Sequence, residues 1–225
     1  MNAGPLGAQV NAFVGRVNAT LKGVLPDLAD QPLEATHRGG TLFVVETAAD
    51  EGLTLTKKGE PFLALTVRYE CGWDGPEAFT RVNQSEFWLY RYGETPALFR
   101  YEFTQGAHRH RPVAHVHVHT DDQRILDVMT DAGTATRTGK KHARRASQGK
   151  AQHADLHLPV GGPRFRPALE DVLHMAVEEF GSTTNPVGLR ALRQAVRTGV
   201  ASRPGPPYAM RRRTPPRRLS PWTTQ

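Results

Sequence analysis

The chain has 225 residues, 38% of them hydrophobic, and a mean hydropathy of −0.50, which is polar but not typical of a wholly disordered chain. No apolar run approaches the roughly 20 residues that span a bilayer, and the first residues lack the basic and apolar regions of a signal peptide. The single cysteine, Cys71, excludes an intrachain disulfide, so we expect a cytoplasmic protein without membrane contact.

The formal net charge of +7 is unevenly distributed along the chain. Residues 132–154 carry six lysines and arginines and no acid, and residues 190–225 carry nine arginines and no acid. This leaves 14 of the 29 basic residues against 22 acidic residues in the rest of the chain. The pattern excludes a uniformly basic nucleic-acid-binding protein and indicates an acidic body with two basic segments.

The first half of the chain predicts one helix followed by strands. Apolar spacing predicts an amphipathic helix over 7–24, which Pro26 ends. Short runs rich in β-branched and aromatic residues then predict strands near 41–47, 61–70, 78–83, 86–92, 97–103 and 112–119, with a hairpin over 86–103 that turns at 93–96. The aromatic residues Trp88, Tyr90 and Tyr92 are expected in the core, and a surface for stacking bases is the alternative.

The second half predicts helices separated by polar segments. Residues 125–129 are expected to form a short helical turn, and the basic segment 131–152 is expected to be a disordered loop because it lacks apolar residues. A strand is predicted over 154–160, helices over 167–180 and 187–200, and a disordered proline- and arginine-rich tail over 201–225. This order predicts a single α+β domain over residues 1–200, with an antiparallel meandering sheet and helices packed on one of its faces.

Histidines are concentrated in the last of the predicted strands before the basic segment. Five of the ten histidines in the chain lie between His108 and His119. Because residues two apart on a strand point the same way, Ala114, Val116 and Val118 are expected to face the core. The opposite face then carries His115, His117 and His119.

Three interpretations of this face stay open. A pair of histidines at i and i+2 can hold a divalent ion such as Zn²⁺, so His115 and His117, completed by His157 or an acid, are candidate metal ligands. Three alternating histidines span roughly 13 Å at about 3.3 Å per residue and therefore cannot all share one ion. Alternatively, the imidazoles act as acid and base beside an arginine, or they are only the solvated or half-buried face of a strand. No cofactor other than this metal ion is expected.

Neighbouring strands could add charged groups to the same face. Alternation places Arg68 with Glu70, and Arg100 with Glu102, on the polar sides of their strands. If these strands lie beside the histidine strand, the gathered set would suit acid–base chemistry and phosphate binding. It would comprise Arg68, Glu70, Arg100, Glu102, His115, His117, His119 and His157.

A stretch of about 35 residues resembles a known family. The segment Phe87-Trp-Leu-Tyr-Arg-Tyr-Gly, then Leu98-Phe-Arg-Tyr and the histidine-rich run, resembles the core of TumE-like toxins of toxin–antitoxin pairs. The chain differs from that pattern because Glu102 replaces an aspartate and because the histidines alternate with valines. The resemblance implies an RNA-directed toxin, with a ribonuclease activity as one form of it, and an antitoxin-like protein partner.

The candidate catalytic residues are His115, His117, His119, Arg100 and Glu102. The basic loop and tail are expected to contact RNA or another nucleic acid. Two other functions remain open: a non-enzymatic protein that binds a protein or nucleic acid, and a protein that binds a metal through the histidine strand.

Overall fold

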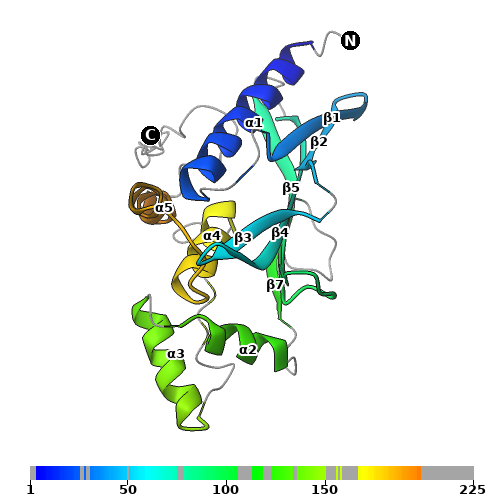
Figure 1. Cartoon of the computed structure of the whole chain (residues 1–225). Helices are drawn as coiled ribbons and strands as arrows, with labels where there is room; N and C mark the ends of the chain where they lie inside the picture. The colour runs from blue at the N-terminus through cyan, green and yellow to red at the C-terminus, as the bar shows by residue number, and fades with distance from the viewer. Residues whose placement is uncertain are drawn as a thin grey trace, which may run out of the picture.

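The computed structural model describes residues 4–25, 28, 31–49, 51–74, 79–105, 113–118, 123–133, 136–150, 156, 158 and 167–198. It is an α+β fold in which the helices lie on one side of an antiparallel sheet (Figure 1). The helices are α1 (Gly4–Val24), α2 (Gln123–Asp131), α3 (Arg137–Ser147), α4 (Leu169–Glu178) and α5 (Pro186–Thr198). Within the described part of the chain, no helix is both long and apolar enough to cross a membrane.

The sheet has seven strands, ordered β1-β2-β4-β5-β6-β7, and β3 pairs with the first part of β4. Their bounds are β1 (Leu33–Gly39), β2 (Leu42–Thr47), β3 (Leu53–Lys57), β4 (Glu60–Trp73), β5 (Thr80–Arg91), β6 (Phe99–Thr104) and β7 (Ala114–Val118). The predicted sheet class is confirmed, but the sequence did not predict β1 or β3. The strands predicted at 78–83 and 86–92 are a single strand, β5.

The core lies between the helices and the covered face of the sheet. The ring of Phe13 on α1 meets Tyr69 of β4 edge-on at 5.2 Å, and Tyr69 meets Phe87 of β5 at 5.5 Å. Tyr101 of β6 is fully buried and donates a hydrogen bond from its hydroxyl to Sδ of Met175 on α4 (3.3 Å). Burial raises the pKa of Tyr101, so this hydroxyl stays protonated as a donor.

The basic segment expected to be a disordered loop is largely helix α3, so that prediction is wrong for residues 137–147. Thr136 begins the helix, because its side chain accepts a hydrogen bond from the backbone N–H of Gly139 (2.9 Å). His142 is 2% exposed, and its Nε2 lies 2.9 Å from Oε2 of Glu179, just after α4. Polar contacts therefore hold α3 against the body without the large apolar side chains that the prediction required.

Two other predicted segments lie wholly or partly outside the residues that the structure describes. Of the strand predicted over 154–160, only Leu156 and Leu158 are described; neither belongs to a strand, and both pack against the core. The tail 201–225 lies outside the described residues.

Candidate functional site

The face of the sheet away from the helices, here called the open face, carries most of the sheet's charged side chains. The strand register aligns one residue from each of six strands in a row across this face. In order from β1 to β7, the row contains Glu34, Glu46, Arg68, Glu86, Glu102 and His115.

The row brings carboxylates directly opposite one another on neighbouring strands. Glu34 pairs in register with Glu46, and Glu86 pairs in register with Glu102. Like charges in opposite positions of an antiparallel sheet are destabilising unless a cation lies between or beside them. The open face is therefore a place where a bound cation would stabilise the protein.

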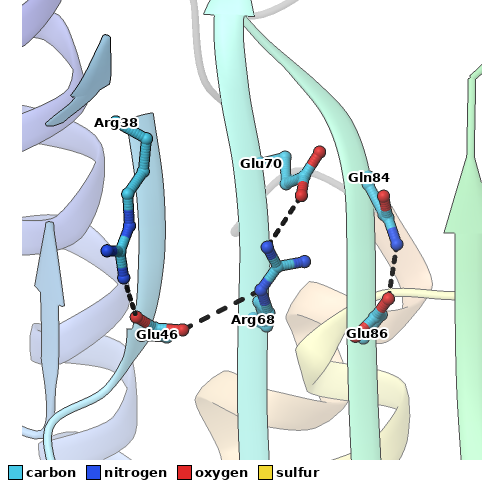
Figure 2. A network of polar contacts seen from close by, with 6 residues as sticks. All are labelled: Arg38, Glu46, Arg68, Glu70, Gln84 and Glu86. Atoms are coloured by element: carbon cyan, nitrogen blue, oxygen red, sulfur yellow. Dashed lines mark hydrogen bonds and ion pairs between the residues drawn. The ribbon is translucent and has the colours of Figure 1, made fainter. Parts of the chain in front are cut away.

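Arg68 neutralises part of this charge. Its guanidinium donates to Oε1 of Glu70 at 2.7 Å and lies 3.8 Å from Oε2 of Glu46, which also pairs with Arg38 at 3.3 Å (Figure 2). Glu86 stands outside this network and accepts a hydrogen bond from Gln84 (Figure 2). Arg68 and Glu70 thus share the open face with the histidines, as predicted, but they are engaged with other partners.

At the β6–β7 end of the row, one carboxylate and two imidazoles converge. Oε2 of Glu102 lies 3.1 Å from Nε2 of His115 and 3.8 Å from Nε2 of His117. One ligand atom from each of the three residues lies within 4.8 Å of the others. The side chains of Glu102 and His115 are each 18% exposed, whereas that of His117 is 46% exposed. The cluster is therefore partly shielded but open to solvent on the His117 side.

Arg100 and Trp88 extend the cluster by two residues along β6 and β5. Arg100 lies opposite His117 on β7 and opposite Trp88 on β5, and its guanidinium carbon is 5.4 Å from the centre of the Trp88 ring. This cation–π contact orients the guanidinium beside the histidines.

Three buried polar atoms in and beside the cluster lack hydrogen-bond partners among the described residues. They are Nδ1 of His115, Nε of Arg100 and Nε1 of Trp88. Buried polar atoms are nearly always hydrogen-bonded in folded proteins, to protein, water or ligand. Trp88, Arg100 and His115 occupy neighbouring positions of β5, β6 and β7, so unmet hydrogen-bonding capacity is concentrated in and beside the cluster.

No family model matches the chain. Nor does any curated protein or solved structure.

The structure brings four of the six candidate catalytic and metal-ligating residues together. The other two lie outside the described residues. Arg100, Glu102, His115 and His117 come together at one end of the open face. His119 and His157 lie outside the described residues.

Trp88, Tyr90 and Tyr92 were expected in the core, and that expectation is wrong. Trp88 and Tyr90 lie on the open face, and Tyr92 is 40% exposed. Alternation along β5 explains this, because Phe87 and Leu89 take the buried positions.

Sequence reasoning also missed a hollow of about 530 Å³ on the open face. Trp88 and Tyr90 form part of its wall, together with threonines and charged residues of β1, β2 and β4 and the two alanines that follow β2. Three carboxylates line it, those of Glu34, Glu46 and Glu86. Alternation along β2 and β5 puts Glu46 and Glu86 on the open face, and this is the sequence signal that could have indicated the hollow.

Proposed function

We propose that the protein binds a divalent metal ion through Glu102, His115 and His117 and uses it to cleave phosphodiester bonds in RNA. The observation that carries the proposal is the convergence of these three side chains from β6 and β7, with ligand atoms within 4.8 Å of one another. Two ligands bound to one ion at about 2.0–2.1 Å lie roughly 3–4 Å apart. The glutamate–histidine separations of 3.1 and 3.8 Å fall in that range.

The chemistry of the ligands favours Zn²⁺. The cluster offers two imidazole nitrogens and one carboxylate oxygen and no thiolate, a set that catalytic zinc sites use with a further position left for water. When bound, such an ion supplies a Lewis acid and makes a water molecule nucleophilic near neutral pH. The same ligand set also suits Fe²⁺, so elemental analysis rather than geometry assigns the ion.

The neighbouring residues have natural roles in this reaction. Arg100 would bind the non-bridging oxygens of the scissile phosphate, because a guanidinium matches that group with paired donors. Water would attack phosphorus while the bond from phosphorus to the leaving sugar oxygen breaks, and that oxygen would take a proton from solvent water. Glu86, in register with Glu102, is the nearest carboxylate in the row and would accept the proton from water.

RNA is proposed as the substrate on two grounds. The strands from Phe87 to the histidines resemble TumE-like toxins, and the chain carries a basic helix, α3, beside an acidic body. This proposal places the protein in the cytoplasm with an antitoxin-like protein as its partner.

Metal content of the purified chain tests the proposal. We expect about one ion per chain after equilibration with Zn²⁺ and dialysis, measured by elemental analysis. His117→Ala should lose the ion, because it removes one of three ligands. His37→Ala is the matched control, since His37 lies on β1 with its ring against Phe43 and away from the cluster.

Two results would contradict the proposal. A wild-type chain without stoichiometric metal would exclude the metal centre. RNA cleavage that persists at full rate in a chelator, yet is lost in His117→Ala, would instead favour acid–base catalysis by the histidines themselves.

The hollow supports a second candidate function, non-enzymatic binding of a cationic partner. Among the described residues, Glu34 has no cationic partner, and the Trp88 and Tyr90 rings offer faces for cation–π contacts. Glu34→Gln separates the two functions, because it should weaken binding of a basic partner and leave metal content and RNA cleavage unchanged.

A further inference from the structure

We propose that α3 is a rigid RNA-binding element whose exposed basic ridge, formed by Arg137, Lys140 and Arg144, holds the phosphate backbone of the substrate. This inference rests on the proposed function for the identity of the nucleic acid. The surface itself follows from the charge, spacing and anchoring of α3.

The basic ridge follows from helical spacing. Arg137, Lys140 and Arg144 are three and four residues apart, so they lie along one side of the helix, and all three are exposed. Within the described part of the chain none of them has a carboxylate partner. No acid occurs between residues 132 and 154. The ridge therefore presents positive charge that the protein does not neutralise.

The opposite side of α3 is fixed to the body. His142 is buried against Glu179, whose side chain is 8% exposed. A Cβ atom added to Gly139 would lie 2.5 Å from the carbonyl oxygen of Gly133, so the helix passes very close to the preceding turn. The hydroxyl of Thr136 also donates to the carbonyl of Glu178 at 2.7 Å. These contacts hold the ridge in one orientation before any partner binds, which lowers the entropy lost on binding.

The composition of the exposed surface of α3 indicates which class of partner it suits. Protein interfaces have an apolar centre, and membrane-bound helices carry large apolar residues on one face. The sequence of α3, Arg-Thr-Gly-Lys-Lys-His-Ala-Arg-Arg-Ala-Ser, has no apolar residue larger than alanine. Such a surface suits a polyanion that is bound mainly through its charge. RNA, with its phosphate backbone, is a polyanion of this kind.

The position of α3 in the molecule agrees with this assignment. α2 lies below the end of β7 and α3 lies next to α2, so the ridge is at the same end of the molecule as the histidine strand (Figure 1). The row of carboxylates from Glu34 to Glu86 extends in the other direction from the cluster and would repel phosphates. RNA held by the ridge is therefore expected to pass around the β7 edge of the sheet to reach Glu102, His115 and His117 on the open face.

Binding of a fluorescent oligouridine of about 20 nucleotides, followed by anisotropy in a chelator at several salt concentrations, tests the proposal without cleavage. The test variant is Arg137→Gln/Lys140→Gln/Arg144→Gln. We expect its affinity at low salt to fall at least tenfold. The slope of log K against log salt should decrease by about 2, because each phosphate contact on a single strand contributes about 0.7.

The matched control removes the same charge elsewhere. Arg16→Gln/Lys22→Gln/Arg81→Gln replaces three exposed basic residues on α1 and β5, and its affinity should stay within about twofold of the wild type. Equal losses of affinity in both variants would mean that binding depends only on net charge, and this would overturn the proposal that the ridge binds RNA. Unchanged binding in the α3 variant, or tighter binding of polyglutamate or anionic vesicles than of oligouridine, would also overturn it.

The result is independent of the metal centre. The binding assay contains a chelator and therefore no metal, so the wild-type chain and the ridge variant can be compared whether or not Glu102, His115 and His117 hold an ion. Failure of the metal proposal would thus appear in the elemental analysis, and failure of the ridge would appear in the salt dependence of binding.

Discussion

Glu102→Gln should reduce metal-dependent RNA cleavage by at least about 100-fold, because changes to residues that merely support metal ligands already cost roughly 10–100-fold. Glutamine keeps the shape of the side chain and replaces a charged ligand oxygen by a neutral one. Both histidines approach the carboxylate of Glu102, at 3.1 and 3.8 Å. It is the one carboxylate of the three-residue cluster, so its loss leaves the cluster with imidazole ligands alone. Initial rates on a labelled RNA, with and without added Zn²⁺, measure the effect.

Glu70→Gln provides the matched control for this prediction. It makes the same chemical change on the same face of the sheet, but Glu70 pairs with Arg68 and lies outside the cluster. We expect its activity to stay within about threefold of the wild type, since a partly exposed ion pair contributes about 1 kcal/mol or less. Equal activity of Glu102→Gln and Glu70→Gln would show that the carboxylate of Glu102 is not a ligand.

Gly188→Ala should destabilise the protein by about 3 kcal/mol, as expected when a side chain is forced into a packed interface. Gly188 lies near the start of α5, where an added Cβ atom would overlap the carbonyl oxygen of Gly23 at the end of α1. Asn185 donates to that same oxygen at 2.9 Å, and Thr184 donates to the next carbonyl, that of Val24, at 2.6 Å. The two helices would have to separate, which would break both hydrogen bonds.

Gly15→Ala should have the opposite sign. Gly15 is exposed in the middle of α1, and a Cβ atom there would meet nothing within 4 Å. Alanine has the higher helix propensity, so this variant should be more stable by about 0.5–1 kcal/mol. Urea unfolding followed by circular dichroism measures both free energies, and a neutral Gly188→Ala would show that α5 does not press on α1.

The fold could be predicted from the sequence wherever side chains alternate or recur with a clear period. Period-2 alternation in residues 61–70 and 97–103 predicted β4 and β6, and it correctly placed Arg68 with Glu70 and Arg100 with Glu102 on the face opposite the buried residues. β1 was missed because it lies at the edge of the sheet and buries only Leu33. β3 was missed because a five-residue strand with two leucines gives too little pattern.

The ordered helix α3 could not be predicted from composition. Its position depends on a buried histidine–glutamate contact with a partner 37 residues away and on a close approach of backbone at Gly139. Neither leaves a mark in the local pattern of apolar residues, which is the signal that a helix prediction uses.

The candidate site was only half predictable for a similar reason. The shared face of His115 and His117 follows from local alternation alone. That Glu102 is the carboxylate opposite His115 depends on the register of β6 against β7, which the sequence does not specify locally. The alignment of Glu86 with Glu102 likewise required the order of the strands.

The place of β7 at the edge of the described sheet bears on the stability of the proposed metal site. β7 has five residues, and among the described residues it pairs only with β6, so its backbone is among the first parts of the sheet expected to fray. An ion held by Glu102 on β6 and by two histidines on β7 would tie the outermost strand to its neighbour. The availability of the metal would then determine whether β7 stays paired with β6 or frays. The same ion would both stabilise the edge of the sheet and supply the Lewis acid for the reaction.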